Sequence, residues 1–359
     1  MRIRAALGRG NFILRSYAKK SFLRLFRIQL LFVAVFLLIV SSLLTAPTRQ
    51  CIWEGVEKII AIGDLHGDCE HFVTILKDQG IKLVDNDLNW IGGKTHLVQI
   101  GDVMDRGDHA KDIFDLIKKL EKQAAAAGGM VHMLIGNHEE MNIMEKAFDY
   151  REYVSVTQLK DFVRDEYKNK KEEEFEKKVG KGSDTTSQWQ ELIDKQDPEA
   201  RAEYFEFFNT YYGRWIAEEH NAVIKINDTV FVHGGMNEKY SKMKLQDINN
   251  LYYTEFLRVF RGESFRTKIL FDPDGPLWFR ELATWIEQLY SSEVDKILAN
   301  LGAHHMVVAH TPFIQDKLHR FGERVWLIDT GISSLYHGFL SALIIENGNF
   351  TTWRKNYAS

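Results

Sequence analysis

Five short motifs in this sequence combine small residues with side chains that bind metal ions. They are Gly63-Asp64-Leu65-His66-Gly67-Asp68, Gly101-Asp102-Val103-Met104-Asp105-Arg106-Gly107, Gly136-Asn137-His138-Glu139, His233-Gly234-Gly235 and Ala309-His310-Thr311. Divalent metals that accept both oxygen and imidazole ligands need Asp, Asn and His side chains held on rigid supports. Each motif alone could be an ordinary structural turn, but the set of five indicates one metal centre.

The elements that must position these motifs are short buried strands. Apolar runs rich in β-branched and aliphatic residues predict strands at 58–62, 96–100, 130–135, 229–232, 306–309 and 325–328. Between the first of them, apolar residues recur at helical spacing over 72–76 and 113–120. This alternation of strands and helices indicates an α/β domain. Because loops that leave adjacent strand ends can converge on one pocket, the motifs are expected to meet there.

The segment from about 150 to 220 departs from this pattern and is predicted to be a helical insertion. Residues 168–178 are rich in Lys and Glu, which is typical of a solvated helix face. Residues 204–215 are rich in Tyr, Phe and Trp, which favours the buried face of packed helices. A role as a lid over the metal centre stays open for this aromatic stretch.

The motifs Gly-Asp-x-His-Gly, Gly-Asp-x-x-Asp-Arg-Gly and Gly-Asn-His-Glu stand intact in this chain, and they resemble those of the calcineurin-like metallophosphoesterases, in their phosphoprotein phosphatase branch. The similarity covers about 58–348. It implies a sandwich of two central mixed β-sheets flanked by helices over 51–359, with the helical insertion at about 150–220.

Within this branch the sequence is most similar to the Shewanella-like protein phosphatases. The stretches that carry the similarity are 136–142, Gly275-Pro276-Leu277-Trp278-Phe279-Arg280 and 307–312. Eukaryotic Ser/Thr phosphatases carry Ser-Ala-Pro-Asn-Tyr-Cys near the C-terminus, and the loop at 329–338 lacks it. Tyr336 and His337 in this loop either line the pocket or serve only the loop's structure.

The resemblance implies a centre of two divalent metal ions. It assigns Asp64 and His66 to the first metal, Asp102 as the bridge between both, and Asn137, His233 and His310 to the second. A carboxylate can bridge two cations roughly 3.5 to 4 Å apart, which supports the bridging role of Asp102. The set of Asp, Asn and His ligands suits Mn, Fe and Zn equally.

The expected reaction is phosphomonoester hydrolysis on a phosphorylated protein or peptide, on either Tyr or Ser/Thr. Two close cations polarise a shared water into hydroxide, which attacks phosphorus in line. By resemblance, His138 donates a proton to the leaving oxygen and Asp105 orients His138. Arg106 and Arg280 have the planar fork that grips two phosphate oxygens. Their alternatives are an ion pair for Arg106 and a packed turn around Trp278 for Arg280.

Two other functions compete with this prediction. A symmetrical dinucleoside tetraphosphate hydrolase shares the metal motifs, and a catalytically dead, membrane-tethered binding protein would reuse the fold. The second would be marked by missing ligands, whereas all six proposed ligands are present. Nucleic acid is not an expected partner, because 46 basic and 50 acidic residues give a net charge of -4 with no global basic footprint.

The first fifty residues differ from the rest of the chain. They contain nine Arg or Lys residues and no acid, and an apolar run at 30–44 is interrupted only by Ser41 and Ser42. This run approaches the roughly 17 residues that cross a bilayer. The favoured interpretation is a single-pass signal anchor with the catalytic domain on the luminal, extracytoplasmic or periplasmic side. A cleaved signal peptide with secretion, an organelle transit segment and a buried core helix are the alternatives.

Overall fold

The computed structural model describes residues 49–145, 150–264, 266 and 268–357. The chain divides between residues 48 and 49, and the account below concerns the part that begins at Arg49. The basic and apolar segment expected at residues 1–50 lies almost wholly outside the described residues. Within them, no helix is both long and apolar enough to cross a bilayer.

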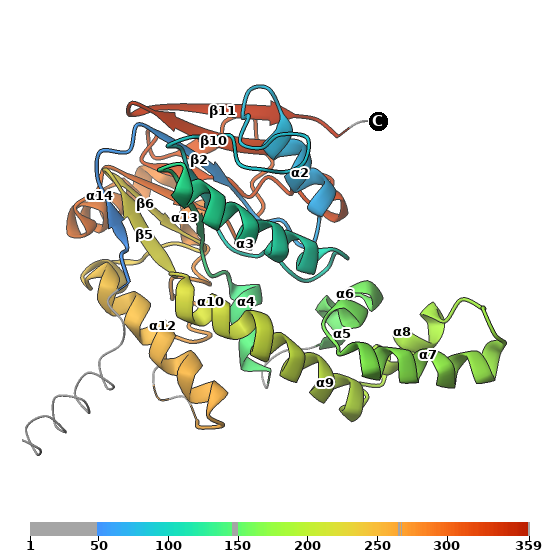
Figure 1. Ribbon diagram of the computed structural model, residues 1–359. Coiled ribbons are helices and arrows are strands. Elements are labelled where there is room, and N and C mark those ends of the chain that lie inside the picture. The colour runs from blue at the N-terminus through green and yellow to red at the C-terminus, as the bar shows by residue number, and fades with distance from the viewer. Residues whose placement is uncertain (1–48, 146–149, 265, 267, 358–359) are drawn as a thin grey trace, which may run out of the picture. The chain divides into compact units, whose positions relative to one another are not determined.

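Two mixed β-sheets form the centre of the described domain (Figure 1). The five-stranded sheet has the order β11 (Asn349–Lys355), β10 (Leu340–Glu346), β2 (Lys58–Ile62), β3 (His96–Gln99), β4 (Met130–Met133). The six-stranded sheet has the order β1 (Ile52–Trp53), β5 (Val223–Ile226), β6 (Thr229–Val232), β7 (His305–Val308), β9 (Val325–Leu327), β8 (His319–Arg320). Strands β2, β3 and β4 are parallel, and so are β6, β7 and β9. In each group the carboxyl ends of the strands therefore lie at one end of the sheet.

Helices cover these sheets because the central strands are buried on both faces, as parallel strands require. Helix α2 (Cys69–Lys77) packs on β10, α3 (Ala110–Ala126) packs on β4, and α12 (Leu245–Phe260) packs on β5. Among the described residues outside the region 150–220, the remaining helices are α4 (Asn137–Met144), α11 (Glu238–Ser241), α13 (Glu281–Thr284), α14 (Glu287–Leu301) and the 3-10 helix η2 (Ser334–Tyr336). The expected α/β architecture of two mixed sheets flanked by helices is confirmed.

The apolar runs located the central strands well. The predictions 58–62 and 229–232 agree with β2 and β6, and the other four runs deviate from β3, β4, β7 and β9 by at most two residues at either end. Strands β1, β5, β8, β10 and β11 were not predicted. Strand β11 is an edge strand whose residues are mostly exposed, so it lacks the apolar run on which the prediction relied.

Residues 150–219 are built from helices. They are α5 (Tyr150–Tyr153), α6 (Val156–Asp161), α7 (Asp165–Val179), α8 (Thr186–Asp194), α9 (Pro198–Phe208), the π-helix η1 (Asn209–Gly213) and α10 (Arg214–Glu219). Tyr204, Phe205 and Phe208 are buried, which fits the expected packed face, whereas Tyr211 is 55% exposed. Helix α9 contacts α4, and α3 contacts α6, so this region packs on elements of the sandwich.

Candidate metal centre and active site

Five loops bring the predicted ligands to the carboxyl ends of parallel strands. Asp64 follows β2, Asp102 follows β3, and Asn137 begins α4 just after β4. His233 directly follows β6, and His310 follows β7. All five are at most 5% exposed. The two sheets therefore bring these predicted ligands together in one buried site.

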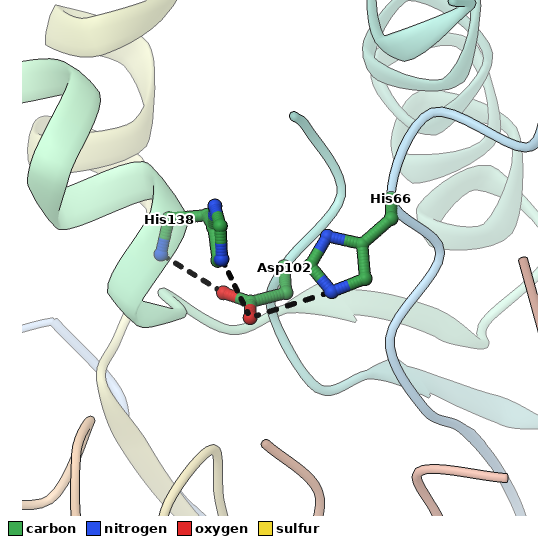
Figure 2. Close-up of side chains that lie close together, drawn as sticks. All are labelled: His66, Asp102 and His138. Carbon is green, nitrogen blue, oxygen red and sulfur yellow. Dashed lines mark hydrogen bonds and ion pairs between the residues drawn. The ribbon is translucent and has the colours of Figure 1, made fainter. Parts of the chain in front are cut away.

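Asp102 lies at the centre of two groups of donor atoms. In the first group, one atom each of His66, Asp102 and His138 lie within 4.8 Å of one another. Figure 2 shows both imidazole rings directed at the Asp102 carboxylate, whose Oδ2 lies 3.9 Å from each Nε2 atom. The second group joins Asp102 with His233 and His310 under the same distance limit. The two groups share only Asp102, which is the arrangement expected of a bridging carboxylate.

The hydrogen bonds of His233 show that this site fits a cation. Its Nδ1 lies 3.0 Å from the carbonyl oxygen of Ile100, which can only accept, so Nδ1 carries the proton. A histidine that binds a metal does so in its neutral form, and Nε2 is then an acceptor. It lies 3.0 Å from Oδ1 of Asn137 and 3.2 Å from Oδ2 of Asp102, which are acceptors too. Three converging acceptors are complementary to a positive ion.

Burial favours the neutral form of the other two predicted histidine ligands, His66 and His310. His66 Nδ1 lies 3.2 Å from the Met104 carbonyl oxygen, which leaves Nε2 free to face Asp102. Burial, and then the charge of His138, lowers the pKa of His66 to about 3. The buried Nε2 of His310 has no hydrogen-bond partner among the described residues. Burial and the neighbouring His233 hold the pKa of His310 well below its usual range. Neutral imidazole is the form that binds metals.

The carboxylates of the site repel one another. Burial, and then Asp329 and Asp102, raise the pKa of Asp64 well above its usual range. Burial would also raise the pKa of Asp102, but the surrounding histidines, His233 and His138 first, bring it well below its usual value. Such crowding of buried negative charge is relieved by a cation. The donor set therefore fits the divalent metals that the sequence predicted.

Asp64 is placed beside His310 and His233. Its Oδ2 accepts a hydrogen bond of 3.2 Å from the His310 backbone N–H, and its Oδ1 lies 3.7 Å from Nδ1 of His233. Asp64 belongs to neither group of donors around Asp102. The sequence expected it to pair with His66, but its recorded contacts lie on the side of the second group.

The predicted proton donor and its partner form a tight pair. His138 Nδ1 lies 2.8 Å from Oδ2 of Asp105, and the His138 backbone N–H donates to Oδ1 of Asp102 at 2.9 Å. Burial opposes a charge on His138, but the carboxylates of Asp102 and Asp105 overcome it and raise the pKa of the imidazole. When it is protonated, the ring directs one proton to Asp105 and carries the other on Nε2. This is the state required of a general acid.

The two predicted phosphate-binding arginines lie beside the site, and both are exposed. The guanidinium of Arg106 lies 4.9 Å from the ring centre of Tyr153 and 5.8 Å from that of Tyr336. Arg280 Nη1 donates to the His310 carbonyl oxygen at 2.7 Å, which places the guanidinium against a ligand loop.

The stretch that ends at Arg280 is also a packed turn, as its alternative interpretation held. The indole N–H of Trp278 donates to the buried carboxylate of Glu140, and burial raises the pKa of Glu140 to about 8. The Pro276 carbonyl oxygen accepts the N–H of Gly234 at 2.8 Å, next to His233. The turn therefore supports the His233 loop, and Arg280 at its end still reaches the ligand loop of His310.

Five site residues other than glycine have left-handed backbone conformations. They are His66 (φ 43°), Asp102 (φ 54°), Asp105 (φ 70°), Arg106 (φ 72°) and His310 (φ 64°). This conformation is uncommon for such residues and is typical of sites whose side chains must be aimed against local preference. Gly136 has a related role, because a Cβ atom there would lie 2.2 Å from Oδ1 of Asp102.

Several residues that shape the site were not predicted. Glu139 accepts the backbone N–H groups of Asp102 and Val103 at 2.8 and 2.9 Å and so fixes the bridging loop. Its place in the Gly-Asn-His-Glu motif was the available signal. Gln158 and Tyr204 contact Asp105 and its neighbours from the helical region, and no motif marks them.

Comparison with known proteins places this site in a family. The family model described as calcineurin-like phosphoesterase matches residues 57–313. The chain is 30% identical to Shewanella-like protein phosphatase 1 of Plasmodium berghei, over 78% of this chain and 68% of that protein. It is also 30% identical to Shewanella-like protein phosphatase 2 of Arabidopsis thaliana, over 74% of this chain and 68% of that protein.

A solved structure shares both the fold and part of the sequence. The cold-active protein-tyrosine phosphatase of a psychrophile Shewanella species superimposes with a TM-score of 0.63 and 26% identity, covering 86% of this chain and 83% of that one. Motifs, site geometry, family model and relatives all agree. This chain belongs to the calcineurin-like phosphoesterase family, with Shewanella-like phosphatases among its relatives, and it is a metal-dependent phosphatase.

Proposed function

We propose that this enzyme removes phosphate from phosphorylated proteins with the help of two divalent cations. The observation that carries the proposal is that two groups of metal-binding atoms share the single Asp102 carboxylate. His138, which is hydrogen-bonded to Asp105, lies next to this carboxylate. One cation would be held by His66 and Asp102, and the family resemblance assigns Asp64 to the same cation. The other would be held by Asp102 together with Asn137, His233 and His310. Mn, Fe and Zn all suit this donor set.

When bound, the cations supply charge that neutralises phosphoryl oxygens and lowers the pKa of a water molecule. The protein's own residues do the rest. Asp105 holds the Nδ1 proton of His138, so that Nε2 presents its proton to the leaving oxygen of the substrate. Arg106 and Arg280 bind the remaining phosphoryl oxygens through their guanidinium groups.

We propose phosphotyrosine as the preferred substrate residue. The ring of Tyr336 lies 5.2 Å from that of His66, and the ring of Tyr153 lies 5.1 Å from that of His138. These two aromatic side chains flank Arg106, and they offer apolar walls to a phenyl ring. A phosphoserine side chain has no ring to contact them. The Shewanella relative that shares the fold is itself named a protein-tyrosine phosphatase.

The test is release of phosphate from one peptide sequence synthesised with phosphotyrosine, phosphoserine or phosphothreonine, with Mn, Fe or Zn added separately to the metal-free domain. We expect the highest kcat/KM on the phosphotyrosyl peptide. Equal rates on all three peptides would remove the tyrosine preference. Cleavage of diadenosine tetraphosphate alone would overturn the protein phosphatase function in favour of a nucleotide hydrolase.

We also propose that the basic and apolar N-terminal segment attaches the enzyme to a membrane. The catalytic domain would then lie on the luminal, extracytoplasmic or periplasmic side. The support is the excess of Arg and Lys before the apolar run at 30–44. Extraction of the full-length protein from membranes at alkaline pH, and protease protection of the domain, test this. Release of the full-length chain in the alkaline wash would contradict it.

A further inference from the structure

Several buried side chains form hydrogen bonds with Asp105 and with one another. Gln158 of α6 and Tyr204 of α9 supply two of its members from the helical region, and Asn142 of α4 supplies another. Asp105, Asn142, Gln158 and Tyr204 all have an exposed fraction of 0%. The hydrogen bonds of these side chains described below connect them with Asp105, His138 and one another, so we consider what they do to Asp105.

Three N–H groups converge on the Asp105 carboxylate. Its Oδ1 accepts from Gln158 Nε2 at 2.7 Å. Its Oδ2 accepts from Asn142 Nδ2 at 2.8 Å and from His138 Nδ1 at 2.8 Å. The Asp105 backbone N–H in turn donates to Gln158 Oε1 at 3.0 Å. Gln158 therefore forms hydrogen bonds with both the backbone and the side chain of Asp105. The backbone of Asp105 is left-handed, with φ 70°.

The direction of every hydrogen bond in this set is determined. A backbone N–H can only donate, so Gln158 must present its oxygen to Asp105 N and its NH₂ group to the carboxylate. Asn142 Nδ2 also donates to the His138 carbonyl oxygen at 3.0 Å, which fixes its amide in the same way.

The Tyr204 hydroxyl links the two amides. It accepts from Gln158 Nε2 at 2.7 Å and donates to Asn142 Oδ1 at 2.8 Å. Neither amide can turn over without losing a hydrogen bond in a site from which water is excluded, and such a loss is costly. The Asp105 carboxylate is thus held in one orientation, and its hydrogen bond with Nδ1 fixes the orientation of the His138 imidazole.

We propose that Gln158 and Tyr204 are positioning residues for the proton donor His138, and that the helical region 150–219 supports catalysis through these two side chains. This inference rests on the proposed function of His138. Without the two side chains Asp105 can rotate, and the Nε2 proton of His138 no longer points at the leaving oxygen.

The experiment compares Gln158→Met and Tyr204→Phe with the wild type on aryl phosphates of different leaving groups. A general acid matters most when the leaving group is poor, and general acid catalysis is worth about 10²- to 10⁴-fold. For Gln158→Met we expect kcat on phenyl phosphate to fall about tenfold, as a partial loss of that factor. The fall on 2,4-dinitrophenyl phosphate should be much smaller, and KM and metal content should not change.

Trp189→Phe is the matched control. Trp189 is a fully buried residue of α8, and its indole N–H donates to Glu172 at 2.9 Å. The substitution also removes one buried hydrogen bond from the helical region, but it touches none of the four residues around Asp105. It should lower the melting temperature and leave the ratio of the two aryl phosphate rates unchanged.

His138→Ala separates failure of this inference from failure of the proposed function. If His138→Ala slows both aryl phosphates equally, the proton donor assignment fails. If His138→Ala discriminates between them while a folded Gln158→Met or Tyr204→Phe does not, the positioning role is refuted. In the double variant His138→Ala with Tyr204→Phe, the second substitution should add no further leaving-group dependence. Tyr204→Phe removes a single oxygen and decides the question if Gln158→Met does not fold.

A spectroscopic readout is independent of turnover. The His138 Nδ1 proton, held between imidazole and carboxylate, should give a far-downfield proton NMR signal that His138→Ala identifies. We expect this signal to shift or to broaden by exchange with water in Gln158→Met and to persist in Trp189→Phe. An unchanged signal in a folded Gln158→Met protein would contradict the inference.

Discussion

Two groups of buried histidines lie at different places relative to the strands of the two sheets. One is the site group of His66, His138, His233 and His310 beyond the carboxyl ends. The other is formed by His96, the first residue of β3, and His132 of β4, whose Nδ1 and Nε2 atoms lie 3.0 Å apart. Trp53 closes this second group, with its ring 4.4 Å from that of His132.

The two groups show that burial alone does not make a histidine functional. Burial, and then the neighbouring His96, lowers the pKa of His132 to about 3. Burial acts on His138 in the same direction, but Asp102 and Asp105 reverse it and raise its pKa. Because His96 and His132 share one hydrogen bond, at least one of them must be neutral. The carboxylates, and not the imidazoles, distinguish a reactive site from a packed one.

The largest expected effect comes from removing the shared carboxylate. Asp102→Asn should lower kcat by about 10³-fold or more, since several kcal/mol of charge stabilisation depends on the bound cations. Phosphate release and metal content by mass spectrometry measure it together. Asp115→Asn, an exposed carboxylate of α3 paired with Lys111, is the control. Full activity of Asp102→Asn with metal bound would contradict the mechanism in which Asp102 is shared by two cations.

The next effect contrasts the two groups directly. His138→Ala should lower kcat on poor leaving groups by about 10²-fold or more, because the general acid is lost. His132→Gln keeps an amide able to bond His96 and should leave kcat within a factor of about two. Steady-state kinetics on phenyl phosphate give both numbers. A loss of activity in His132→Gln comparable to that of His138→Ala would break the distinction between the groups.

Metal removal should lower the stability of the protein only when the predicted metal ligands of the site group are intact. Ligands that bind only the folded state stabilise it by about 2.7 kcal/mol at a free concentration of 100 times Kd. A chelator should therefore lower the melting temperature of the wild type and of His132→Gln equally. Asp102→Asn should show little or no such shift in differential scanning fluorimetry. An equal shift in Asp102→Asn would place the stabilising metal elsewhere.

The smallest effect is a pH dependence carried by the second group. The folded pKa of His132 lies at about 3 and its ordinary value is 6.5, so between these values the unfolded chain binds a proton that the folded chain does not. Stability is therefore lost as pH falls below 6.5, by about 1.4 kcal/mol per pH unit for this one residue. Urea unfolding at pH 7, 6 and 5 should show a shallower loss in His132→Gln. Identical slopes would mean that His132 already binds a proton when folded.

The sequence located the central strands, whose ends carry the predicted site residues, better than it located the strands around them. Strands β2 and β6 are continuous apolar runs, so local composition was enough to place them. The predicted metal ligands follow such runs closely, and each of them except His310 has a glycine as a direct neighbour in the sequence. Strand β11 escaped prediction because it is an exposed edge strand. Strand β10 is a largely buried and mostly apolar segment, and it was missed although its composition fits a strand.

The support around Asp105 could not have been found from local patterns. Gln158 lies 53 residues from Asp105 and reaches it only because α6 packs near α3. Tyr204 belonged to an aromatic stretch that was correctly expected to be buried, but nothing in its spacing shows that its hydroxyl fixes two amides. Contacts between segments far apart in sequence are determined by the tertiary fold.

The left-handed backbone of the five site residues has a consequence for laboratory evolution of this enzyme. Such conformations cost about 1 to 3 kcal/mol each and persist only because the surrounding structure enforces them. Replacing the exposed Arg106 by glycine would relieve the backbone without leaving a buried partner unpaired, but it would also remove a proposed phosphate contact. A screen for heat resistance alone would therefore select inactive variants at these positions first, and only a screen that also scores turnover would preserve them.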